Sequence, residues 1–120
     1  GEDLMAAVKA KLSNYRVSTR RARLLADAIR GKQVEEALAF LDLSPRRFAK
    51  PLAKLVRSAV ANAEVQNERE KAGIDVDNLV VSRITVDEGP SIWRIRARAQ
   101  GRASWIQKRS SHVHLELEER

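Results

Sequence analysis

The chain has 120 residues, with 23 Lys and Arg against 16 Asp and Glu, and a formal net charge of +7 at pH 7. This length allows one domain with a modest core, which we place over residues 1–120, and the positive charge favours nucleic acid as a partner ahead of an anionic membrane surface. The lack of cysteine excludes disulfides and thiolate metal sites, and no apolar run approaches the ~18–20 residues of a membrane-spanning helix.

The positive charge lies at the two ends of the chain. Residues 1–50 carry eleven Lys and Arg against six Asp and Glu, residues 51–90 five against seven, and residues 91–120 seven against three. We therefore expect the ends to form the contact surface and the middle to serve as scaffold.

The first part of the chain is predicted to form a strand and two helices. The loose alternation of Met5–Val17 predicts an edge strand. Ser18 is a suitable N-cap for a helix that stops at Gly31, a good residue for a left-handed C-terminal cap. Apolar residues at helical spacing predict a second, short helix over Gln33–Leu41.

Basic residues crowd the start of the first predicted helix. Arg20, Arg21 and Arg23 lie in its first turn, where the helix dipole disfavours cations unless an anion is bound. A nucleic-acid contact and a solvated basic turn both remain open for each of them. Arg16 and Lys32, on either side, are further candidate contacts.

A long helix is predicted from Ser44 and Pro45, as N-cap and first residue, to about Arg69. Pro51 should either kink this helix or mark its true start. Four basic residues form a stripe along it, which fits either phosphate binding or a solvated face: Arg46, Lys50, Lys54 and Arg57.

Two runs near the end of the chain predict an antiparallel hairpin: Leu79–Val86 and Val113–Leu117. Pairing Val80 with Glu118 and Val86 with His112 centres the hairpin close to Gly101, which tolerates the positive φ of a turn. The same register sets Trp93 opposite Trp105. Gly89 and Pro90 should form a bulge where the hairpin leaves the sheet.

The stretch Gly89–Leu115 contains six Lys and Arg and no Asp or Glu. Its arginines alternate with apolar residues, so an extended strand would place them on one cationic face. The two tryptophans allow two interpretations, a cross-strand pair that stiffens the hairpin or stacking on exposed bases. We expect α+β architecture, with three helices packed on a small antiparallel sheet from which a long β-hairpin protrudes.

No arrangement of residues points to catalysis. Asp87 and Glu88 are neighbours on an extended segment, so their carboxylates point to opposite sides and do not form an acid–base pair. His112 and His114 share a strand face, but only Glu116 offers a third ligand, so a solvated face or an RNA contact is favoured over a metal site. We expect no enzyme activity, cofactor, metal or small-molecule substrate.

Three segments resemble, in order and spacing, the bacterial-type large-subunit ribosomal protein L22 family: VSTRRARLLADAIRGKQVEEAL, LVRSAVANAE and VDEGPSIWRIRARAQGRASWIQKRSSHVHLEL. The resemblance covers about Tyr15 to Glu118. It implies one domain whose globular part (about 5–88 and 108–120) binds large-subunit rRNA and aids its folding. The hairpin (about 79–118, protruding near 89–108) would line the polypeptide exit tunnel.

Carried over by position, the resemblance implies two sets of residues in the distal hairpin. Its rRNA-binding residues would be Arg94, Arg96, Arg98 and Arg102. Its tunnel-lining residues would be Trp93, Ile95, Ala97, Gln100 and Gly101, with Gly101 at the turn. An RNA-bound base would be formed by Lys108, Arg109, Ser110 and His112. The chain departs from the family at two positions. Trp93 stands where the family commonly has a basic residue, and Ala97 stands where it has proline.

The expected partners are large-subunit rRNA, neighbouring ribosomal proteins and the nascent polypeptide, in a bacterial or organellar ribosome, without membrane contact. We expect a monomer when free. The alternative is a DNA-binding regulator that uses its short helices as a helix-turn-helix; it would prefer duplex DNA and form a dimer.

Overall fold

The computed structural model describes residues 8–97, 101 and 103–120, and in them three α-helices and five strands. The elements follow in the order β1 (Val8–Tyr15), α1 (Thr19–Ile29), α2 (Val34–Leu43), α3 (Ala49–Glu70), a short 3₁₀ turn η1 (Val76–Asn78), β2 (Leu79–Glu88), β3 (Ile92–Ala97), β4 (Ala103–Lys108) and β5 (Ser111–Glu119). The predicted edge strand, first two helices and hairpin arms are therefore confirmed.

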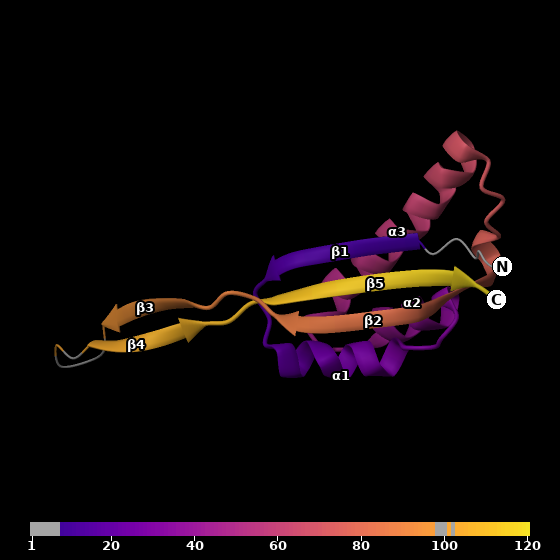
Figure 1. Cartoon of the computed structure of the whole chain (residues 1–120). Helices are drawn as coiled ribbons and strands as arrows, with labels where there is room; N and C mark the ends of the chain where they lie inside the picture. Colours follow the sequence, from indigo (N-terminus) through magenta and orange to yellow (C-terminus); the bar gives the residue numbers. More distant parts are fainter. Residues whose placement is uncertain (1–7, 98–100, 102) are drawn as a thin grey trace.

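The strands form two separate antiparallel sheets. One is three-stranded with the order β1-β5-β2, and the other consists of β3 and β4 alone. Figure 1 shows the β3–β4 hairpin projecting from one end of the larger sheet, whereas the helices lie beside that sheet. The principal extents of 64 × 27 × 23 Å reflect this elongated shape. The predicted α+β fold with a protruding hairpin is confirmed.

The core lies between the three-stranded sheet and the helices. The central strand β5 buries alternate residues, among them Val113, Leu115 and Leu117. On β2 the buried positions change from odd to even numbers after Val81, because a bulge between Val81 and Arg83 shifts the pairing with β5. The bulge thus keeps the apolar face of β2 turned toward the helices on both of its sides.

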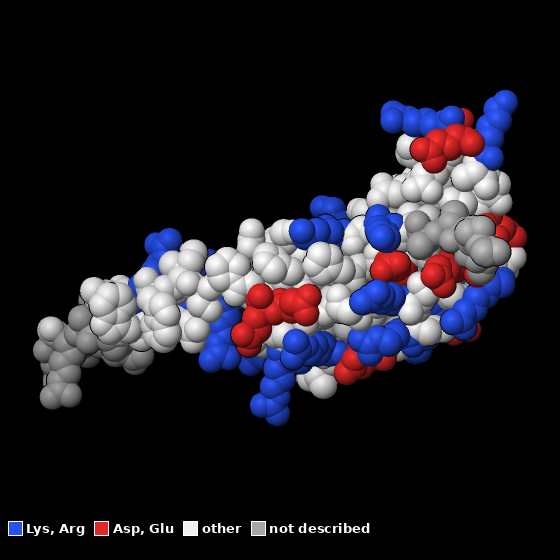
Figure 2. Space-filling view, viewed as in Figure 1, with Lys and Arg blue, Asp and Glu red and all other residues white. Residues whose placement is uncertain are grey.

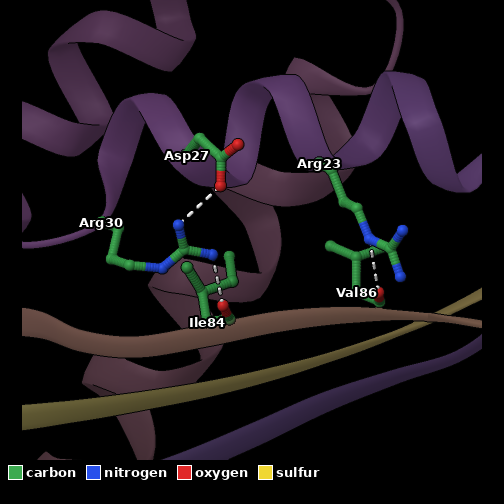
Figure 3. Close-up of polar contacts among 5 residues, drawn as sticks. All are labelled: Arg23, Asp27, Arg30, Ile84 and Val86. Carbon is green, nitrogen blue, oxygen red and sulfur yellow. Dashed lines mark hydrogen bonds and ion pairs between the residues drawn. The ribbon is translucent and has the colours of Figure 1, made fainter.

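Helix α1 covers the open edge of β2. Ser18 caps α1, and Gly31 follows it with a φ of +83°, both as predicted. The Nε of Arg23 donates to the Val86 carbonyl at 3.0 Å, and the Nη2 of Arg30 donates to the Ile84 carbonyl at 2.8 Å. Figure 3 shows both guanidinium groups reaching from α1 to β2. These bonds satisfy edge carbonyls that would otherwise be open to another strand.

We expect Arg30→Met to lower the free energy of unfolding by about 1–2 kcal/mol, because the Ile84 carbonyl loses its hydrogen bond and the exposed Asp27 carboxylate loses its ion pair, which contributes the smaller part. Methionine keeps most of the aliphatic stem. Arg20→Met is the control, because Arg20 is exposed at the opposite end of α1; this substitution removes the same charge without removing the contact with Ile84 and should leave stability nearly unchanged. Urea unfolding followed by circular dichroism measures both, and equal stabilities would contradict this role of Arg30.

The predicted start of the long helix is wrong by four residues, because its first residue is Ala49 and not Pro45. Ser44 is instead the C-cap of α2, and its Oγ accepts a hydrogen bond from the Arg46 amide. Helix α3 begins at Ala49, which leaves Pro51 as its third residue. This confirms the alternative that the helix starts near Pro51, since an amide in the first helical turn has no intrahelical acceptor to lose.

The predicted pairing of Trp93 with Trp105 is also wrong. Val80 pairs with Glu118 as expected, but Val86 pairs with Val113, one residue away from the prediction. Within the hairpin Trp93 lies opposite Gln107, and Trp105 opposite Ile95. The β2 bulge and the break between the two sheets each displace the register, so the tryptophans lie diagonally on one face.

Candidate nucleic-acid interface

The most basic concave surface described lies where the hairpin leaves the body. It has a volume of about 890 Å³ and is formed by the start of α1, the turn before α3 and the end of β4. We call it the basic groove. Among the described residues its lining includes no carboxylate and six cationic residues: Arg16, Arg21, Arg46, Arg47, Lys108 and Arg109. Such a surface focuses a positive potential that attracts phosphate.

Hydrogen bonds fix the chain that supports this groove. The Ser18 Oγ accepts from the Arg21 amide at 3.3 Å and so caps α1. The Ser111 Oγ, fully buried, donates to the Val17 carbonyl at 2.9 Å and lies 3.0 Å from the Thr19 Oγ1. The β1–α1 connection is thereby fastened to β5, and this connection sets where the first-turn arginines lie.

The basic groove continues onto one face of the hairpin. Ile106 and Lys108, on β4, belong to the groove lining. Arg94 pairs with Ile106 across the two strands, so the two side chains share a face, and Arg94 is exposed. The pairing of β3 with β4 therefore agrees, at Arg94, with the expected cationic face of the hairpin.

The other face of the hairpin is apolar and open. Trp93, Ile95 and Trp105 are 57%, 62% and 66% exposed. In Figure 2 the side of the hairpin turned toward the viewer is largely uncharged, whereas Lys and Arg are frequent on the body. The described side chains of this face carry no charge, whereas the opposite face combines Arg94 and Lys108 with Ile92 and Ile106. The two faces differ in charge, so they suit different partners.

A second groove of about 480 Å³ lies between α1 and the base of the hairpin. Arg20, Arg23 and Arg109 line it, but so do Asp27 and Glu88. The carboxylates reduce its positive potential, and Arg23 already uses its Nε on β2. This groove is a weaker candidate for phosphate binding than the basic groove.

Ser110 and His112 have roles within the protein at the hairpin base. The Ser110 Oγ donates to the Pro90 carbonyl at 2.7 Å, and the Gly89 amide donates to the Ser110 carbonyl at 2.9 Å. The Nδ1 of His112 accepts a hydrogen bond from the Asn14 amide at 3.0 Å. These bonds hold the junction between the two sheets.

We expect Gly89→Ala to destabilise this junction by about 1–2 kcal/mol, the cost of displacing one bonded hydroxyl with some strain. A Cβ at position 89 would lie 2.6 Å from the Ser110 Oγ, and that hydroxyl is held on Pro90. In a Ser110→Ala background the added cost should fall, because the obstructing oxygen is gone. A double-mutant cycle by urea unfolding measures this coupling, and strict additivity would contradict the proposed clash.

The remaining residues predicted to contact RNA or to form the hairpin tip lie away from the two grooves or outside the described residues. Lys32 lies beyond the C-terminal end of α1, with its Nζ 4.8 Å from the centre of the Phe40 ring, and does not line either groove. Gly101 has a φ of +72°, as a turn requires. Arg98, Gln100 and Arg102 lie outside the described residues, as do the side chains of Arg96 and Ala97.

Arg47 is a groove residue that the sequence analysis missed. It lies with Arg46 in the turn before α3, a segment that had been assigned to the helix. The Ser-Pro-Arg-Arg run was the available signal, because such a turn presents adjacent side chains to solvent. Arg57, from the basic stripe predicted along the long helix, instead binds within the protein. Its Nη2 lies 2.9 and 3.1 Å from the two carboxylate oxygens of Asp42.

Within the described ranges, no cluster of three or more His, Asp or Glu residues could hold a metal ion. No helix there is both long and apolar enough to cross a membrane.

Comparisons with known proteins agree with the resemblance seen in the sequence. The family model for ribosomal protein L22p/L17e matches residues 10–118. The chain belongs to this family. It is 52% identical over 108 residues to the large ribosomal subunit protein uL22 of Anaeromyxobacter sp. (strain K), covering 90% of this chain and 71% of the relative. It is 47% identical over 112 residues to the uL22 of Desulfatibacillum aliphaticivorans, covering 93% and 98%.

Membership of a ribosomal-protein family confirms the expectation that the chain is not an enzyme. It also removes the support for the DNA-binding alternative, which rested on the short helices and the basic charge alone.

Proposed function

We propose that this chain is a structural constituent of the large ribosomal subunit of a bacterium, where it binds large-subunit rRNA and assists its folding. The observation that carries the proposal is the basic groove, whose cations come from three separate segments of the chain and face no carboxylate among the described residues of its lining. Family membership and relatives named as large-subunit proteins support it.

In this proposal the arginines of the groove bridge phosphates from different RNA segments. Arginine can donate two parallel hydrogen bonds to one phosphate, and its charge persists at any physiological pH. The groove offers Arg16 and Arg21 from one side and Lys108 and Arg109 from the other. Because the major groove of A-form RNA is too narrow for side chains, recognition is of backbone and shape.

The hairpin is proposed to line the polypeptide exit tunnel, with its cationic face on RNA and its apolar face toward the lumen and the nascent chain. The exposure of Ile95 and Trp105 supports this arrangement. We propose that the whole chain is one domain, that neighbouring large-subunit proteins contact it, and that it is a monomer when free.

The test compares binding of the purified protein to a large-subunit rRNA fragment, a random RNA duplex and duplex DNA across a salt series. We expect a preference for the rRNA fragment that survives moderate salt. Equal affinities for all three nucleic acids that are lost together as salt rises would contradict specific rRNA binding and indicate only nonspecific attraction to a basic protein. A preference for duplex DNA would instead favour the DNA-binding regulator.

A further inference from the structure

A second kind of concave surface lies away from the basic groove, between α2, α3 and η1. It has a volume of about 310 Å³, and its lining shares no residue with the basic groove. Its floor is aliphatic: Val34 is buried, and Leu38, Val60 and Val76 are partly buried and pack against the core. Because these side chains still reach the surface, an apolar side chain placed over them would lose contact with water.

Three carboxylates surround this floor, one from each element. Glu35 comes from α2, Glu64 from α3 and Asp77 from η1, and all three residues are exposed. Among the described residues of the lining the one cation is Arg57, and its Nη2 is bound to both carboxylate oxygens of Asp42. The rim is therefore negative, in contrast to the overall charge of +7. We call this surface the acidic groove.

From this combination we infer that the acidic groove is a docking site for a Lys- or Arg-rich polypeptide segment that inserts one or two aliphatic side chains between α2 and α3. The charge of the rim selects the partner class, since phosphates of RNA or lipid would be repelled by three carboxylates. The volume is near the lower end of the ~300–1,000 Å³ typical of ligand pockets, so it suits one or two side chains and not a whole helix.

The consequence is a division of surfaces. The basic groove and hairpin take nucleic acid, while the acidic groove takes cationic protein. The inference does not rest on RNA binding, because the two surfaces have no lining residue in common. If an experiment contradicts one of the two proposed binding surfaces, the proposal for the other surface is unaffected.

The test uses the full chain, isotope-labelled, and two synthetic peptides of Lys and Gly: one with two central leucines, the other with serines in their place. The leucine peptide should shift the amide resonances of Leu38, Val60 and Val76, and the serine peptide should bind far more weakly. The inference is overturned if these resonances do not move at millimolar peptide, if an RNA oligonucleotide moves them instead, or if they move with protein concentration alone, which would indicate self-association.

The charged rim is tested with matched pairs of substitutions. Glu35→Lys with Glu64→Lys should weaken binding of the leucine peptide about tenfold, as expected for reversing two rim charges. Glu36→Lys with Glu70→Lys is the control, because both residues are exposed on the same helices, lie outside the groove lining and change the net charge equally. Equal losses in the two pairs would overturn the inference, and thermal unfolding verifies that each variant is folded.

Discussion

Replacing Arg21, Arg46 and Arg47 together by Ala is expected to lower the affinity for large-subunit rRNA by about a hundredfold or more near 0.1 M salt. All three line the basic groove. Each phosphate that loses its cation should reduce the slope of log K against log salt by about one. Fluorescence anisotropy across a salt series therefore gives two readouts, an affinity and a slope that falls by about three.

The control for this variant removes the same charge elsewhere. Lys11, Arg69 and Arg120 are exposed and lie outside both the basic groove and the second, mixed groove at the hairpin base. Their joint replacement by Ala should cost little affinity beyond the general loss of positive potential. If both triple variants lose affinity equally and with equal slopes, the groove is not the binding surface, and only net charge matters.

Leu52→Ala is expected to destabilise the protein by about 3 kcal/mol and to lower its Tm by roughly 10 °C. Leu52 lies on α3 with none of its surface exposed. Shortening it removes buried methyl groups and leaves a cavity, because its neighbours are held by the sheet and cannot collapse onto the space. Since small domains are stable by only about 5–15 kcal/mol, this is a large fraction of the total.

Leu43→Ala is the matched control for Leu52→Ala. Leu43 is also helical, as the last residue of α2, but it is 86% exposed. The chemistry of the two substitutions is the same, so the difference between them isolates burial. We expect the free energy of unfolding of the Leu43 variant to differ from that of the parent protein by less than about 0.5 kcal/mol. Similar destabilisation of both variants by thermal and urea unfolding would contradict the assigned core.

The local elements of the fold were predictable because their signals are local. Ser18 and Gly31 delimit α1 through the backbone conformations that caps require, and the β-branched run of β2 favours extended chain. The start of α3 was misplaced because Ser44 and Pro45 carry the same start signal whether a helix or a turn follows. Here Ser44 ends α2 and its hydroxyl stabilises the turn.

The sequence predicted that the candidate interface is basic, but it did not predict which basic residues form it. The acid-free stretch around the hairpin indicated an anionic partner, and Arg16, Arg21, Lys108 and Arg109 meet in one groove. Arg47 joins them from a turn distant in sequence, which no periodicity reveals. Arg23 and Arg57 were equally good candidates by charge, yet they bind Val86 and Asp42 within the protein.

By itself, the sequence determined the α+β class, the two arms of the hairpin and the partner class, because propensity, alternation and net charge belong to the chain before it folds. It also carried the family resemblance. Only the tertiary structure decided the register of Trp93 and Trp105, since a bulge in β2 is a property of strand pairing. Tertiary packing likewise decided which charges remain open to a partner, because a guanidinium on a helix and the group that binds it are brought together only by the fold.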